Sequence, residues 1–130
     1  MPPIVHNHQL LGIKVDKITP GSKPITDPKE FIQMVTLKHP RGTSLPAHYH
    51  KPRIRRTTKL QECLIVKKGK VKLSLYSPEK KLVKKIILKT GQAFIALNGG
   101  LGLTVIDDAE IIEIKNGPFK TDKVLIANEA

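Results

Sequence analysis

The chain has 130 residues, which suffices for one domain with its own hydrophobic core, and 39% of them are hydrophobic. Its 23 Lys and Arg outnumber its 11 Asp and Glu, which gives a formal net charge of +12. No apolar run reaches the roughly 18 residues of a membrane-spanning helix, and the first residues lack the basic and apolar regions of a signal peptide. We therefore expect a cytoplasmic protein with no membrane partner.

The short spacing of turn residues predicts an all-β protein. Ten prolines and nine glycines divide the chain into segments without a helical period. In chain order, residues 13–18 are a candidate strand, residues 20–28 are typical of a loop, and strands are predicted over 31–38, 62–66, 70–76, 81–89, 92–97, 101–106 and 110–115. The clearest is 70–76, where Val71, Leu73 and Leu75 alternate with polar residues. Asp107 and Asp108 are predicted to form a turn. This pattern indicates a barrel or a sandwich.

The positive charge attracts anions, such as phosphorylated metabolites, acidic polymers or nucleic acid. The alternative is that the lysines, which are most of the basic residues, keep strand faces and edges soluble. Nucleic acid is the less favoured partner, because three Phe, two Tyr and no Trp leave few aromatic platforms for stacking bases. A small anionic molecule is therefore the expected ligand.

One segment combines residues suited to metal chemistry. On a strand, residues two apart share a face, so His48 and His50 would project side by side and Tyr49 would point the other way. Glu62 begins an apolar run, where a carboxylate needs a partner. Two imidazoles and a carboxylate from a neighbouring strand can hold one divalent metal ion. The pattern therefore predicts a metal site made of His48, His50 and Glu62.

The stretch from Gly42 to Gly69 resembles the first motif of the cupin family. That motif consists of a glycine, five residues, His-x-His, a spacer, a glutamate, six residues and a glycine. The spacings from Gly42 to His48 and from Glu62 to Gly69 match it. The spacer of residues 51–61 is longer than the three or four residues usual in the family, which we interpret as a longer loop between two strands.

Residues 91–103 resemble the second cupin motif through their turn glycines, but Leu101 stands roughly where the family has its last His ligand. The resemblance covers about residues 31–118. It implies a cupin-type double-stranded β-helix, or jelly-roll, barrel over residues 1–130, with its core at about 31–118, an N-terminal arm at about 1–28, and a homodimer. It also implies that iron, manganese, nickel or zinc would be held by His48, His50 and Glu62.

The missing fourth ligand leaves two interpretations. A site of two His and one carboxylate would leave coordination positions open to a substrate, or the barrel has given up metal altogether. The resemblance favours a metal-binding cupin that binds or acts on a small anionic ligand, for example in carbohydrate or nucleotide-sugar metabolism. Sugar-modifying cupins that work without metal use a His base and a Tyr acid, here His48 with Tyr49 or Tyr76, so whether the protein is an enzyme stays open. The alternative is a metal-free ligand-sensing or polyanion-binding or nucleic-acid-binding barrel without catalysis.

Further candidates lie outside the metal motif. Arg53, Arg55 and Arg56 are expected at the barrel mouth, where their guanidinium groups would bind phosphate or carboxylate, unless this segment is only a solvated loop. Glu113 is expected either to line a pocket or, as we prefer, to form an exposed pair with Lys115. His6 and His8 repeat the His-x-His spacing, but they are weak candidates for a metal site because the N-terminus is expected to fray. Cys63 is expected to be a buried, unreactive thiol. Because it is the single cysteine, an intrachain disulfide is excluded.

Overall fold

The protein is all-β, as the sequence predicts. The computed structural model describes residues 2–126, and over this range it contains strands and no helix. It therefore offers no helix able to cross a membrane within those residues. The strands are β1 (Pro3–His6), β2 (Gln9–Val15), β3 (Gly21–Pro24), β4 (Val35–Lys38), β5 (Glu62–Tyr76), β6 (Leu82–Lys89), β7 (Ala93–Ala96) and β8 (Gly100–Lys115).

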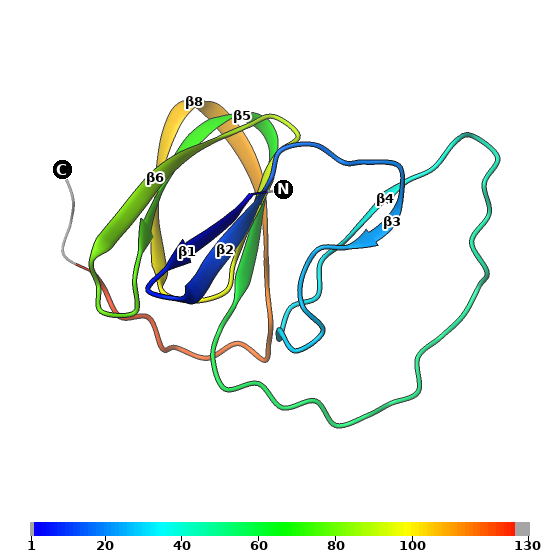
Figure 1. The fold of residues 1–130 in the computed structure, drawn as a ribbon, viewed down its shortest axis with the longest axis horizontal. Helices are drawn as coiled ribbons and strands as arrows, with labels where there is room; N and C mark the ends of the chain where they lie inside the picture. The colour runs from blue at the N-terminus through cyan, green and yellow to red at the C-terminus, as the bar shows by residue number, and fades with distance from the viewer. Residues whose placement is uncertain (1, 127–130) are drawn as a thin grey trace.

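Strand β5 is the centre of an antiparallel sheet that curls into a half-barrel (Figure 1). On one side it pairs first with β7, through Glu62–Ile65, and then with β6, through Lys70–Tyr76. On the other side it pairs with β8 along nearly its whole length. Strands β2 and β1 extend the sheet beyond β7, while β3 and β4 form a separate two-stranded sheet.

The alternation of buried apolar side chains with more exposed ones along β5 forms the main core. Leu64, Val66, Val71, Leu73 and Leu75 point into the curl, and each is no more than 2% exposed. Side chains from the other strands of the sheet complete this cluster, among them Ile4, Leu11, Ile86, Leu88 and Phe94. A second cluster forms on the other face around Cys63 and Ile95. Each fully buried aliphatic side chain contributes roughly 1.5–3 kcal/mol, so this double coverage fixes the position of β5.

The predicted turn at Asp107 and Asp108 is wrong, because β8 continues through them as one 16-residue strand. The register between β5 and β8 shifts at this point, with Lys68 opposite Glu110 and Lys70 opposite Asp107. The extra residue makes a bulge, which accommodates turn-favouring side chains without reversing the chain. Gly69 lies opposite, at a φ of 97° that favours glycine.

The first residues belong to the sheet and are not an arm outside the core. Strands β1 and β2 form a hairpin whose turn residues, Asn7 and His8, have φ of 50° and 64°, as in a type I′ turn. Ile4 and Leu11 from this hairpin lie in the main core. The core therefore extends beyond the predicted region of about 31–118. The prolines and histidines of this segment conceal its alternation.

The predicted strand through His48 and His50 is also wrong. Residues 39–61, which we call the basic loop, contain neither strand nor helix, and residues 39–60 are all exposed. Figure 1 shows the loop standing away from the sheet. Pro40, Pro46 and Pro52 remove backbone donors at intervals, and the charged residues between them have no apolar surface to cover. The predicted strand over 31–38 shortens to β4, because its first half is irregular and packs Ile32 and Met34 against the second core cluster.

Replacing the two motif glycines by alanine distinguishes backbone strain from steric conflict. Gly42 has a φ of 90° but open space around it, whereas a Cβ at Gly69 would lie 2.2 Å from the carbonyl oxygen of Asp108. Gly42→Ala should cost about 1 kcal/mol of unfolding free energy, and Gly69→Ala about 2–4 kcal/mol, because β8 must also shift. Urea unfolding of both variants measures the difference. Equal losses would show that Gly69 and β8 are not packed as described.

Candidate functional site

The basic loop is attached firmly at its second end by Gln61, which is only 1% exposed. The Gln61 side chain accepts a hydrogen bond from the Ile32 amide at 2.9 Å and donates to the Leu97 carbonyl at 3.3 Å. It also donates to Glu30 Oε2 at 3.2 Å. The Gln61 amide donates to Asn116 Oδ1 at 2.7 Å. Because buried polar groups need such partners, the start of β5 and the end of the loop are held together.

Three further hydrogen bonds define where the exposed part of the loop begins and ends. Asn116 Nδ2 donates to the Lys59 carbonyl at 3.1 Å, and the Lys59 amine donates to Asn98 Oδ1. At the other end, a hydrogen bond of 2.8 Å joins the side chains of Ser22 and His39. The segment between His39 and Lys59 is thus fixed at its ends and exposed between them.

The charge of this loop has one sign. No Asp or Glu occurs between Glu30 and Glu62, while the loop contains Lys51, Lys59 and all four arginines of the protein: Arg41, Arg53, Arg55 and Arg56. None of these arginines forms an ion pair with a group in residues 2–126. Unpaired, exposed guanidinium groups are available for bidentate contacts to phosphate or carboxylate. The absence of Asp and Glu from residues 31–61 is the sequence signal for this site. It indicates an anion-binding segment more strongly than the three predicted arginines do by themselves.

The two predicted His ligands lie together but not with the predicted carboxylate. The His48 and His50 rings are 5.1 Å apart, edge to face, and His48 Nδ1 donates to the Pro46 carbonyl at 2.9 Å. Glu62 lies on β5, and residues 2–126 contain no group of three or more His, Cys, Asp or Glu able to hold a metal ion. Leu101, at the position of the family's last ligand, packs against the main core. These residues do not fit a cupin metal centre as placed here, and metal binding stays a prediction.

Glu62 instead belongs to a small charged group on β5 and β8. Half-burial raises the pKa of its carboxyl group above the ordinary value, and the nearby Glu113 carboxylate raises it further, while Lys115 and Lys123 oppose the shift. Lys115 Nζ donates to Glu113 Oε1 at 2.7 Å, which raises the pKa of Lys115. Glu113 and Lys115 thus form the exposed pair that the sequence favours. Cys63, beside them, is buried as predicted, and burial raises its pKa to about 11.

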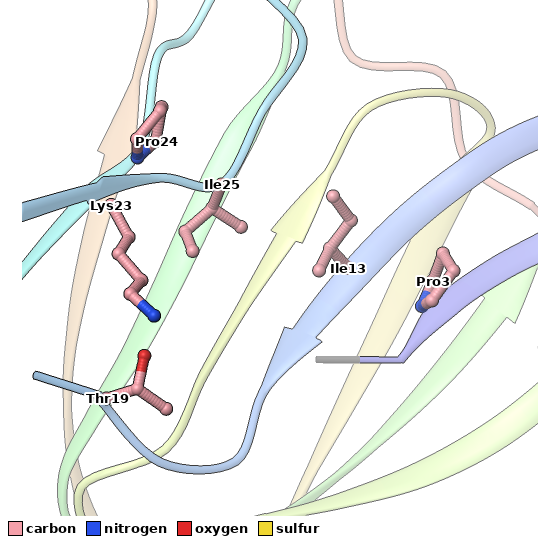
Figure 2. Close-up of a pocket in the computed structure, with 6 residues that line it drawn as sticks. All are labelled: Pro3, Ile13, Thr19, Lys23, Pro24 and Ile25. Carbon is pink, nitrogen blue, oxygen red and sulfur yellow. The ribbon is translucent and has the colours of Figure 1, made fainter.

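Two of the hollows on the surface of residues 2–126 include neither the predicted histidines nor the arginines Arg53, Arg55 and Arg56. One, of about 360 Å³, lies between the main sheet and β3, where Lys23 and Thr19 face each other opposite Ile13 and Pro3 (Figure 2). The other, of about 500 Å³, lies at the base of the loop and includes Lys59. Neither of these hollows is the expected pocket with a metal below and arginines above.

Comparison of the chain with protein-family models, curated proteins and solved structures gives no match. The cupin family therefore stays a resemblance of motif spacing. The function has to be argued from the geometry and charge of the chain itself.

A Glu62→Gln variant tests the environment of the half-buried carboxyl group. Because its pKa is raised in the folded state, the folded chain binds this proton more tightly than the unfolded chain, so stability falls as the pH rises from about 4.5 through the raised pKa. The variant should match or exceed the wild type in unfolding free energy at neutral pH, and lose that advantage in acid. Urea unfolding over a pH series measures this.

Glu79→Gln, in the exposed turn before β6, is the matched control and should change little at any pH. If Glu62→Gln were the less stable protein at neutral pH only, the ionised carboxylate would be stabilising and the assignment of its environment would be contradicted.

Proposed function

We propose that this protein is a metal-independent, non-catalytic β-barrel-like domain that binds the phosphate backbone of nucleic acid through its basic loop. One observation carries the proposal: residues 39–60 are exposed throughout, and the loop holds six Lys and Arg with no acidic residue. Nothing within residues 2–126 neutralises its arginines by an ion pair. A polyanion supplies the missing charges.

The shape of the loop favours a polymer over a small anion. Arg53, Arg55 and Arg56 lie along an exposed, irregular segment, and none of them lines either of the two hollows described above. Small-molecule sites are concave and bury most of their ligand, whereas residues 39–60 are exposed throughout. A chain of phosphates, in contrast, is bound by successive cations along an extended segment.

The aromatic content indicates binding with little sequence preference. Tyr49, between the two histidines, is 87% exposed and is placed to stack on an unpaired base. The protein has one other tyrosine, Tyr76, which is buried in the sheet. Backbone charge is therefore expected to dominate affinity, and binding should weaken steeply with salt.

The salt dependence of oligonucleotide binding tests this proposal. For single strands, the slope of log K against log salt is about −0.7 per neutralised phosphate, so replacing three arginines should reduce its magnitude by about 2. We expect this smaller slope for the triple variant Arg53→Ala, Arg55→Ala and Arg56→Ala. Fluorescence anisotropy with a labelled single-stranded oligonucleotide, repeated over a series of salt concentrations, measures the slope.

A matched triple variant on β6 removes the same charge from exposed residues away from the loop: Lys84→Ala, Lys85→Ala and Lys89→Ala. Its slope should stay close to that of the wild type. Equal slopes for the two triple variants would assign binding to net charge and would contradict a role for the loop.

Metal dependence separates this proposal from the metal-binding cupin. Because the loop binds phosphate through guanidinium and ammonium groups, dialysis against EDTA should leave the oligonucleotide affinity unchanged. Elemental analysis of the same protein, with His48→Ala as the control, reports whether any ion was present. Affinity lost with EDTA and restored by a divalent metal would overturn the proposal in favour of the metal site.

A further inference from the structure

Strand β8 has one long edge without a strand partner. Within residues 2–126, β5 is the strand that pairs with β8, so the backbone N–H and C=O groups along the opposite edge are left unpaired. Apolar side chains on β8 stay 41–51% exposed: Leu103, Val105, Ile106, Ile112 and Ile114. A long edge with exposed apolar side chains is a template for pairing with another chain.

The same strand is acidic, although the protein is strongly basic. Lys115 is its single cation, against four carboxylates: Asp107, Asp108, Glu110 and Glu113. Lysines of β5 approach Asp107 and Glu110 only to 3.9 and 3.8 Å, and these two side chains stay 66% and 59% exposed. Surface pairs of this kind are weak, so the carboxylates remain accessible to another cation.

We infer that the free edge of β8 binds the basic loop of a second copy of this chain as an added strand. Residues 53–58 suit this role, because they contain no proline and combine three arginines with the β-branched Ile54, Thr57 and Thr58. They are exposed and form no backbone hydrogen bond within the described chain. Pairing satisfies both backbones and places guanidinium groups beside the carboxylates of β8.

Charge favours this occupant over a second β8. Two copies of β8 side by side would oppose their carboxylates, which is destabilising. Within one chain, the loop stands away from the sheet and leaves the edge open (Figure 1).

The hydrogen bond that holds the end of the basic loop keeps residues 53–58 close to the end of β8. Lys59 is held beside Asn116, directly after the end of β8, so a partner docked across this end lies within reach of the arginine segment. Reciprocal exchange, in which each copy gives one loop and receives one, produces a closed two-fold dimer.

This inference does not rest on nucleic-acid binding, and the two interactions compete because both use the same arginines. The loop contacts either the acidic strand of a partner or a polyanion. The oligomeric state is therefore measured without oligonucleotide, and failure of one proposal leaves the other standing.

Charge reversal on the two surfaces tests the inference. The edge-reversed variant carries Asp107→Lys, Asp108→Lys and Glu110→Lys, and the loop-reversed variant carries Arg53→Glu, Arg55→Glu and Arg56→Glu. Light scattering on a sizing column should give the wild type about twice the chain mass of 14.5 kDa and each variant the single-chain mass. An equimolar mixture of the two variants should recover the dimer, because each loop again meets an edge of opposite charge.

Circular dichroism confirms that the variants are folded, and the milder set Asp107→Asn, Asp108→Asn and Glu110→Gln should weaken the dimer if the edge-reversed variant does not fold. A monomeric wild type, a loop-reversed variant that stays dimeric, or folded variants that do not associate when mixed would each overturn the inference.

Discussion

The structure depends on the pairing of β5 with three strands. Its first residues pair with β7, its last with β6, and β8 follows it along the other side. Alternate side chains of β5 fill the main core, while Cys63 and Ile65 contribute to the second cluster. In its second half, the buried Val71, Leu73 and Leu75 alternate with polar residues, so a shift of β5 by one residue would expose these side chains and bury lysines in their place.

The basic loop is possible because its attachment to this sheet is local. Gln61 and Asn116 hold the point where the loop enters β5, and they do so through hydrogen bonds of their amide groups rather than through ion pairs with the cations of the loop. The arginines of the loop therefore form no ion pair within residues 2–126. Four acidic residues lie instead on β8, at the far edge of the sheet, where Asp107 and Glu110 form only exposed pairs with lysines of β5. This separation of charge underlies both proposals.

The strands with a clear period of two were predictable from the sequence. Val71, Leu73 and Leu75 identified the centre of β5, and β6 and β7 lie within one residue of their predicted limits. The β1–β2 hairpin was missed because prolines and histidines conceal the alternation around Ile4 and Leu11, its two residues in the main core. The turn at Asp107 was wrongly predicted because the propensity of two aspartates cannot reveal that a partner strand continues opposite them.

The site was predictable in its charge but not in its shape. Arg53, Arg55 and Arg56 are unpaired and exposed, in keeping with the sequence, whereas the strand through His48 and His50 was inferred from spacing without an apolar alternation to support it. Motif spacing reports which residues lie near one another along the chain. It does not report whether a neighbouring strand is available to pair with them, and that decides whether His48, His50 and Glu62 meet.

Nuclear magnetic resonance of the arginine side chains tests the central claim most directly. Since all four arginines belong to the basic loop, their Nε–H signals report on the loop without interference from the sheet. On titration with a single-stranded oligonucleotide, the account predicts shifts in the signals of Arg53, Arg55 and Arg56, with the amides of β6 unchanged. Shifts confined to the lysine-bearing strands, with the arginine signals unmoved, would contradict it.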